Sequence, residues 1–106
     1  MGLFGLFNKT DINDGIQQFE STEGAYLIDV RTPGEYNEGH IPKSVNIPLQ
    51  NIDSIETMSI KMDSPLFLHC LSGSRSAQAV SYLKQKGFRN VTDIGGIERY
   101  KGRIER

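Results

Sequence analysis

The chain has 106 residues, a hydrophobic content of 37% and a formal net charge of −1 at pH 7. This length predicts one domain spanning residues 1–106, and the apolar content is enough for one core but not for two. A net charge so close to zero gives no reason to expect nucleic acid or an anionic membrane surface as a partner.

The first residues are apolar but do not form a membrane signal. Met1 to Phe7 has no basic flank and is too short to span a bilayer, so we expect no secretory leader and no membrane contact. Residues 1–9 are predicted either as a frayed end or as a short first strand. A cap at Thr10 or Asp11 then begins a predicted helix. The apolar stripe of this helix consists of Ile12, Ile16 and Phe19.

Strands and helices are predicted to alternate through the first half of the chain. Residues 25–30 are nearly all apolar, which is typical of a strand buried on both faces. Thr32-Pro33-Gly34-Glu35 has the pattern of a capping box with proline at the first helical position, and Gly39 ends this short helix. Residues 45–47 predict a brief strand, and apolar residues at helical spacing predict a helix over residues 49–55.

The central third of the chain contains a strand, a loop and a long helix. Leu66 to Leu68 is an apolar run that suits a buried strand, and Leu71 to Ser74 suits a tight loop. From Arg75 the apolar residues recur at helical spacing, and Gly87 stands where a left-handed helix cap is expected. Cys70 lies where the strand ends and the loop begins.

The last elements complete the alternation. Residues 91–94 predict a strand, Gly95-Gly96 a turn and residues 97–104 a closing helix. The pattern indicates an α/β fold, with a central, mostly parallel sheet of about five strands and helices on both faces. Sites in such sheets form beyond the carboxyl ends of the strands. The polar clusters at those ends are Asp29 with Arg31, Cys70 to Arg75, and Asp93 with Gly95-Gly96.

The position of Cys70 favours a reactive thiol. Amides at a junction between a loop and a helix lack intrahelical partners, so they can turn into the loop and bind an anion. These amides, the helix dipole and Arg75 all favour the thiolate, which is a strong nucleophile. The alternative is that Cys70 is a small buried hydrophobic residue. As the only cysteine it forms no internal disulfide, which fits a reducing compartment, and we expect a cytoplasmic protein.

Three stretches resemble signatures of the rhodanese family. The first runs over residues 27–36 and continues through Glu38-Gly39-His40-Ile41-Pro42 and Asn46-Ile47-Pro48-Leu49. The second, His69 to Ser76, is similar to the active-site loop of the family, and the third is Gly95-Gly96-Ile97. They follow the family order and spacing over most of the chain. The resemblance implies a rhodanese-like fold and a single-domain sulfurtransferase.

The resemblance also implies a mechanism. Cys70 would carry a persulfide and move sulfane sulfur from a donor, such as thiosulfate or a protein persulfide, to a thiol, a protein cysteine or another thiophile. No metal or organic cofactor is expected, because the two histidines and Cys70 match no metal-ligand spacing. A monomer is the default expectation.

Further residues are predicted to build the site around Cys70. Arg75 is the second predicted catalytic residue, and its guanidinium can contact the anion or brace the loop against a carboxylate such as Asp29. Asp29 and Arg31 are predicted to support the loop as an ion pair, the alternative being ordinary polarity at a helix entry. The residues predicted to bind substrate through the loop amides are Leu71, Ser72, Gly73, Ser74 and Ser76.

The histidines and the C-terminal cations are assigned structural roles. His69 is expected to point away from the loop if strand alternation continues past Leu68. His40 is expected to hydrogen-bond the backbone near Gly39. The residues expected on a solvated face of the last helix, or as a weak rim that steers anions, are Lys101, Arg103 and Arg106.

Loop length distinguishes sulfur transfer from related chemistry. Cys70 and Arg75 enclose four residues, whereas the phosphatases of the cell-cycle type and the arsenate reductases that resemble rhodanese enclose five. A shorter loop suits the single outer sulfur of a persulfide better than a tetrahedral phosphate. Phosphatase or arsenate reductase chemistry therefore ranks below sulfur transfer.

Four positions depart from the family pattern. Lys43, Ser44 and Tyr100 stand where glycine, alanine and tryptophan are common, and we expect them to affect packing or the surface. Leu71 stands where many thiosulfate-preferring loops have a charged residue that helps steer a dianion. A second interpretation therefore stays open, in which the chain is a sulfur-relay or binding module loaded by a partner protein, with free thiosulfate a poor donor.

Overall fold

The computed structural model describes residues 11–106. The elements in chain order are α2 (Ile12–Glu20), β1 (Tyr26–Asp29), α3 (Pro33–Glu38), β2 (Ser44–Asn46), the 3-10 helix η1 (Leu49–Thr57), β3 (Leu66–Cys70), α4 (Ser74–Gln85), β4 (Val91–Gly96) and the 3-10 helix η2 (Ile97–Arg99). The strand or frayed end predicted for residues 1–9 lies outside the described residues.

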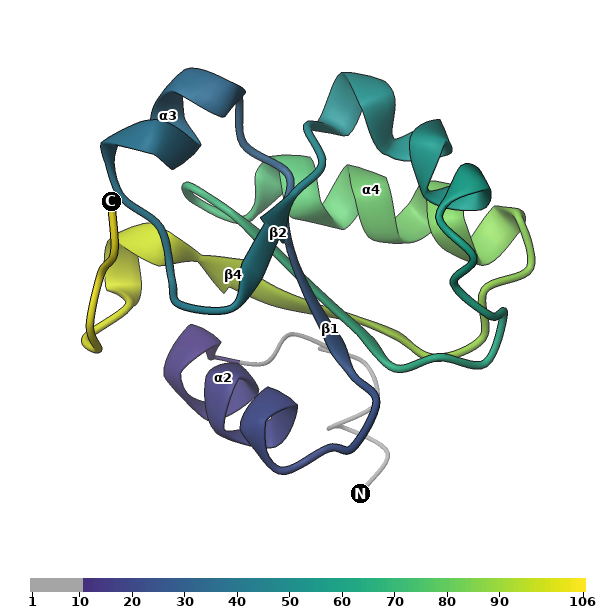
Figure 1. Ribbon diagram of the computed structural model, residues 1–106, viewed down its shortest axis with the longest axis horizontal. Coiled ribbons are helices and arrows are strands. Elements are labelled where there is room, and N and C mark those ends of the chain that lie inside the picture. The colour runs from purple at the N-terminus through teal and green to yellow at the C-terminus, as the bar shows by residue number, and fades with distance from the viewer. Residues whose placement is uncertain (1–10) are drawn as a thin grey trace.

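The strands form one parallel sheet in the order β2-β1-β3-β4. Figure 1 shows α2 on one face of this sheet and α4 with η1 on the other. The predicted α/β fold with a parallel sheet and helices on both faces is confirmed. Four strands lie within residues 11–106, so the expected number of about five was approximate.

Two apolar clusters hold the helices against the sheet. Side chains alternate along a strand, so Leu68 and Cys70 face α4 while Phe67 faces α2. All five residues of β3 are buried, as befits a central strand with a core on each side. Cys70 therefore belongs to the cluster that packs under α4 and η1.

Both predicted helix starts in the first half of the chain have the expected caps. The Asp11 side chain accepts a hydrogen bond from the amide of Asn13 and caps α2. At α3, the Thr32 hydroxyl accepts from the amide of Glu35, and the Glu35 carboxylate accepts from the amide of Thr32. This capping box fixes the Glu35 side chain at the start of α3, at the carboxyl end of β1.

The junctions around the loop differ from the prediction. β3 extends through Cys70, and the predicted turn at Gly95-Gly96 is wrong, because β4 runs through Gly96 and pairs it with Cys70. A Cβ atom at position 96 would overlap the carbonyl oxygen of Leu71. Glycine there allows β4 to reach the loop, and the amide of Glu98 then donates to that same carbonyl at 3.2 Å.

Two predicted helices have other geometries. The segment predicted as a helix over residues 49–55 is the 3-10 helix η1, with a kink at Asn51. The predicted closing helix over residues 97–104 is wrong, since η2 ends at Arg99 and Tyr100 is already extended. The chain then pairs Glu105 with His40 in an antiparallel bridge, with both N···O distances 2.8 Å. The predicted helical face with Lys101, Arg103 and Arg106 is therefore absent, and these exposed residues lie on a non-helical tail.

Candidate functional site

The thiol of Cys70 lies at the carboxyl end of the central strand, under the loop that leads to α4. Its Sγ accepts hydrogen bonds from the amides of Gly73, at 3.0 Å, and Ser76, at 3.4 Å. Gly73 is the N-cap of α4 and has φ +111°, in the left-handed region that L side chains rarely adopt. This backbone conformation turns the start of α4 over the sulfur.

Other amides of the loop have no partner within the described part of the chain. The prediction assigned the amides from Leu71 to Ser76 to the sulfur, and two of them donate to Sγ. The amides of Ser72, Ser74 and Arg75 donate to no acceptor among residues 11–106. Such free donors are typical of the segment that enters a helix, and they are available to an anion held outside Sγ.

The thiol of Cys70 thus contacts apolar side chains on one side and backbone amides on the other. Cys70 has no exposed surface and packs in the cluster that includes Val30, Leu68 and Ala79. On its other side are the amides described above. The sulfur is not enclosed by hydrocarbon alone, so the interpretation of Cys70 as a purely apolar core residue does not describe its contacts.

Ser76 connects the sulfur to a carboxylate that the sequence prediction left without a role. The fully buried Ser76 hydroxyl lies 3.5 Å from Sγ of Cys70 and donates to Oδ1 of Asp93 at 2.8 Å. The same Oδ1 accepts from the amide of Gly95 at 3.0 Å. The position of Asp93 near the end of the predicted strand 91–94 could have indicated this contact, but only the register of β4 against β3 brings it beside Ser76.

Arg75 braces the loop, but against another carboxylate than the one predicted. Its Nη1 and Nη2 donate to Oε1 and Oε2 of Glu35 at 2.8 and 3.0 Å. Asp29, the predicted partner, does not receive these bonds. The hydrogen bond from Arg75 lowers the pKa of Glu35 to about 2, so this carboxylate is ionised at neutral pH. The pair joins α3 to the start of α4 and balances the charge of Arg75.

The ion pair expected between Asp29 and Arg31 is present and buried. Nη2 of Arg31 lies 2.7 Å from Oδ2 of Asp29, and Nε lies 3.0 Å from Oδ1. Nη2 also donates to the carbonyl oxygen of Gly39 at 2.8 Å. Arg31 lines a surface hollow with Glu35, Glu38, Gly39 and Leu71, next to the loop that follows Cys70. Its charge is engaged by Asp29, as that of Arg75 is by Glu35.

Both histidines lie away from the sulfur. His69 faces Asp29, with Nε2 at 3.8 Å from Oδ2, and this Nε2 has no hydrogen-bond partner among the described residues. Burial lowers the pKa of His69, although the nearby Asp29 opposes this effect. His40 stacks on Tyr36 with ring centroids 3.8 Å apart, and its Nδ1 hydrogen-bonds the Tyr36 carbonyl oxygen at 2.9 Å.

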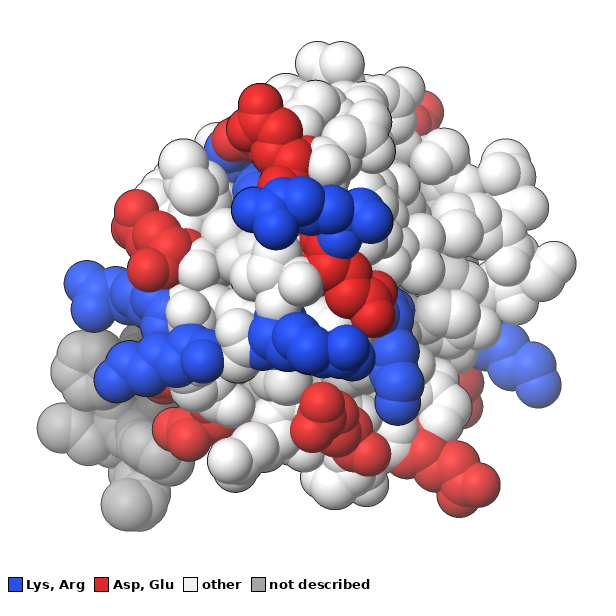
Figure 2. Space-filling view, turned by 60° about the vertical axis from the view of Figure 1, so that its left-hand side comes forward, with Lys and Arg blue, Asp and Glu red and all other residues white. Residues whose placement is uncertain are grey.

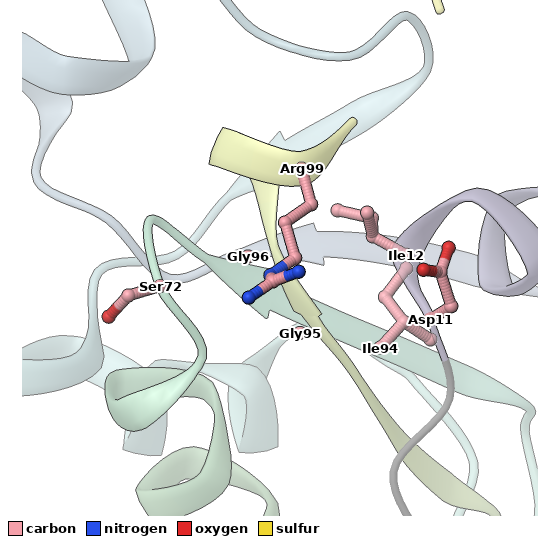
Figure 3. A pocket seen from close by; sticks show the side chains of 7 residues that line it. All are labelled: Asp11, Ile12, Ser72, Ile94, Gly95, Gly96 and Arg99. Carbon is pink, nitrogen blue, oxygen red and sulfur yellow. The ribbon is translucent and has the colours of Figure 1, made fainter. Parts of the chain in front are cut away.

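Two further hollows lie on opposite faces of the sheet beside the loop. One, of about 200 Å³, is on the face of Cys70 and is lined by Val30, Thr32, Pro48, Leu49, Gln50 and Arg75. The other, of about 300 Å³, is lined by Asp11, Ile12, Ser72, Ile94, Gly95, Gly96 and Arg99. Figure 3 shows Arg99 reaching from η2 over Gly95-Gly96 toward the loop. Ile12 and Ile94 belong to the cluster on the α2 face, so the sheet separates this second hollow from the Cys70 side chain.

Charges of both signs are mixed at this end of the molecule. Figure 2, turned toward the end that carries α3 and the C-terminus, shows basic and acidic side chains beside one another and no patch of a single sign. Residues 11–106 contain no group of three side chains placed to hold a metal ion. Within the same residues, no helix is both long enough and apolar enough to cross a bilayer.

The sequence matches the model of the Rhodanese-like domain family over residues 10–103. The chain belongs to this family. A sulfurtransferase of Allochromatium vinosum is 37% identical over 87% of this chain and 86% of the relative. The thiosulfate sulfurtransferase GlpE of Pseudomonas syringae is 35% identical over 74% of each. The adenylyltransferase and sulfurtransferase uba4 of Ogataea parapolymorpha is 32% identical over 92% of this chain but only 25% of that longer protein.

Solved structures agree with the family assignment. The structure described as rhodanese with anions from E. coli superimposes with a TM-score of 0.72 at 28% identity, covering 77% of this chain and 98% of that chain. A rhodanese-related protein of Thermoplasma volcanium gives a TM-score of 0.73 at 30% identity, covering 91% and 97%. The rhodanese-like fold expected from the sequence signatures is therefore confirmed.

Proposed function

We propose that this protein is a sulfurtransferase that carries sulfane sulfur as a persulfide on Cys70. The observation that supports this most directly is the contact of Sγ with the amides of Gly73 and Ser76, next to the amides of Ser72, Ser74 and Arg75, which have no acceptor among residues 11–106. Donors in this arrangement stabilise a negative charge on Sγ before the reaction and on an outer sulfur after it. The sulfurtransferase names of the relatives agree with this chemistry.

The first half-reaction loads the cysteine. The Cys70 thiolate attacks the outer sulfur of the donor, forming a new S–S bond while the donor's own bond to that sulfur breaks. With thiosulfate, the bonding pair leaves with sulfite and the protein retains a persulfide anion. Because Cys70 is buried, the donor has to approach from the side of the loop.

The second half-reaction removes the sulfur from Cys70. A thiophile attacks the outer sulfur of the Cys70 persulfide, and the S–S bond breaks with its electron pair returning to Sγ. Cyanide would leave as thiocyanate, and a thiol or protein cysteine would leave as a persulfide. The loop amides can hold the charge in both states. This cycle needs neither a metal nor an organic cofactor, and it suits a reducing compartment because Cys70 is the only thiol.

Two other functions use the same thiol. In a sulfur-relay module a partner protein would load Cys70, and Leu71, exposed on the loop, favours this alternative over steering of free thiosulfate. A phosphatase or arsenate reductase would need the loop to surround a tetrahedral anion. The four-residue spacing between Cys70 and Arg75 disfavours binding of a tetrahedral anion, and with it both of these activities.

The experiment is to incubate the reduced protein with a sulfane-sulfur donor, remove excess donor, and measure sulfur released by cyanide. We expect one labile sulfur per chain in the wild type and none in Cys70→Ser. Loading by a persulfide-bearing protein together with near-zero turnover of small donors would establish the relay alternative instead. Hydrolysis of an aryl phosphate that is lost in Cys70→Ser, without sulfur loading, would contradict the proposal.

A further inference from the structure

The charges around the reactive face of the loop are balanced within the protein. Both terminal nitrogens of Arg75 bind the carboxylate of Glu35, at 2.8 and 3.0 Å. Arg31, the other guanidinium beside the loop, is bound to Asp29 in the same two-pronged manner. The loop itself presents the apolar side chain of Leu71. Among residues 11–106, a dianion that approaches Cys70 on the face of Arg31 and Arg75 therefore meets backbone amides but no unbalanced cation.

The hollow on the same face of the sheet is mostly apolar. Val30, Pro48 and Leu49 supply hydrocarbon surface, and Val30 and Leu49 pack with the cluster that contains Cys70. Arg75, with its charge balanced by Glu35, forms part of the wall. Such a wall favours an organic group over the hydrated oxygens of an inorganic anion, because apolar contact releases water while a buried anion loses its hydration.

Arg99 does not replace the missing cation. None of the ion pairs among residues 11–106 includes Arg99, and its side chain lies toward the loop in Figure 3. The hollow that it lines lies against Ile12 and Ile94, on the α2 face. The Cys70 side chain packs in the other apolar cluster, on the α4 face of the sheet.

We propose that Glu35 determines donor specificity, so that this sulfurtransferase takes its sulfur from a small organic donor with an apolar group and disfavours thiosulfate. The inference rests on the proposed function. Benzenethiosulfonate is a suitable probe, because it carries one negative charge and an aromatic ring where thiosulfate carries two charges. The Cys70 thiolate forms an S–S bond to its outer sulfur, the bond between the two donor sulfurs breaks, and benzenesulfinate leaves with the electron pair. The charges balance as they do with thiosulfate and sulfite.

The test measures kcat/KM for cyanide-dependent sulfur transfer from both donors. Each value is divided by the rate constant of the same donor with free cysteine, which removes the difference in intrinsic reactivity. We expect the wild type to prefer benzenethiosulfonate by about tenfold or more after this correction. A normalised preference for thiosulfate, or no preference, would overturn the inference.

Glu35→Gln tests the role of the carboxylate. Glutamine retains the capping box at the start of α3 but frees the charge of Arg75. We expect the preference for benzenethiosulfonate to fall by about tenfold, equivalent to about 1.4 kcal/mol, because kcat/KM for thiosulfate rises. Glu23→Gln removes the same charge from an exposed turn before β1, at the opposite end of that strand from the loop, and should leave the preference at the wild-type value. In Glu35→Gln/Arg75→Gln both charges are gone, and the preference should return toward wild type.

The outcomes separate the two proposals. If neither donor loads the wild type, the proposed function fails and the inference fails with it. If both donors load Cys70 but Glu35→Gln leaves their ratio unchanged, only the inference fails. Thermal unfolding of each variant shows whether it is folded, and if Glu35→Gln is not, the normalised preference of the wild type alone decides.

Discussion

At the scale of single residues, the site depends on the few groups that contact the sulfur of Cys70. Cys70 packs against hydrocarbon on one side, and on the other receives hydrogen bonds from Gly73 and Ser76. Charge-assisted hydrogen bonds are about twice as strong as neutral ones, so these donors gain most when the sulfur is an anion. Small changes in the loop should therefore affect sulfur loading more than they affect folding.

Gly73→Ala tests the left-handed N-cap. Alanine at φ +111° is strained, which should cost about 1–2 kcal/mol of folding free energy and displace the amide that donates to Sγ. Urea unfolding and cyanide-labile sulfur measure the two effects. Gly34→Ala in α3 is the control, since it has open space around it and should not destabilise the protein. Equal stability of Gly73→Ala and wild type would contradict the assigned geometry.

Ser76→Ala tests the link between Cys70 and Asp93. The substitution removes a partly buried hydrogen bond of 2.8 Å to the carboxylate and should lower the free energy of unfolding by about 1–2 kcal/mol. Denaturant titration measures this loss. The exposed Ser74, which makes no side-chain hydrogen bond among the described residues, provides the control, and Ser74→Ala should stay within about 0.5 kcal/mol of wild type. Equal effects of the two substitutions would argue against the Ser76–Asp93 contact.

At the scale of elements, the site is assembled by helix starts that follow parallel strands. The capping box of α3 holds Glu35, and Glu35 holds Arg75 in the first turn of α4. β4 approaches close enough to bond the loop because position 96 is a glycine. The capping box, the Glu35–Arg75 pair and the contact of β4 thus together determine the shape of the loop. The ion pair between α3 and α4 is the one that pH can break.

Acid should weaken the contact between α3 and α4. The pKa of Glu35 is about 2 in the folded protein, below its ordinary value of 4.5, mainly because of Arg75. The pair therefore contributes stability above pH 4.5 and loses it as the pH falls toward 2, because the unfolded chain binds the proton first. Since the side chains are about 30% exposed, we expect about 1 kcal/mol. Unfolding titrations between pH 7 and 3 should show a shallower loss for Glu35→Gln than for Glu38→Gln.

At the scale of the whole molecule, the parallel sheet brings the ends of its strands to one edge. Asp29 and Cys70 are the last residues of β1 and β3, and Asp93 of β4 joins this edge through its hydrogen bond with Ser76. On one face the edge carries the thiol, and on the other it carries the buried His69 beside Asp29. The sheet therefore separates the Cys70 thiol from a buried ionisable group, His69, that we expect to influence stability.

Protonation of His69 should destabilise the fold. Burial lowers its pKa below the ordinary value of 6.5, so the unfolded chain takes up a proton before the folded protein does. Stability should consequently fall as the pH drops below about 6.5. Unfolding free energies measured from pH 7.5 to 5.5 would show this slope in the wild type and in His40→Gln, but not in His69→Gln. A persistent slope in His69→Gln would assign it to another group.

The sequence predicted the strands better than their ends. Apolar runs identified β1 and β3, but the polar character of His69 and Cys70 concealed that β3 continues through both. A closing helix was predicted over residues 97–104, yet the chain is extended after η2, where Glu105 pairs with His40.

Within the site, the loop residues were predictable because they are adjacent in sequence. The pairing of Arg75 with Glu35 was not, since 40 positions separate them and several carboxylates were available. Asp29 paired instead with its near neighbour Arg31, whose backbone amide it also binds. Only the register of parallel strands and the capping box decide which carboxylate reaches the loop.

The most direct test of sulfur transfer through Cys70 is the mass of the protein after reaction. Reduced protein is incubated with benzenethiosulfonate, freed of donor and analysed by intact-mass and peptide mass spectrometry, before and after cyanide. We predict a gain of one sulfur atom, located on the peptide that contains Cys70 and removed by cyanide. An unchanged mass, or added sulfur that persists in Cys70→Ser, would contradict the account.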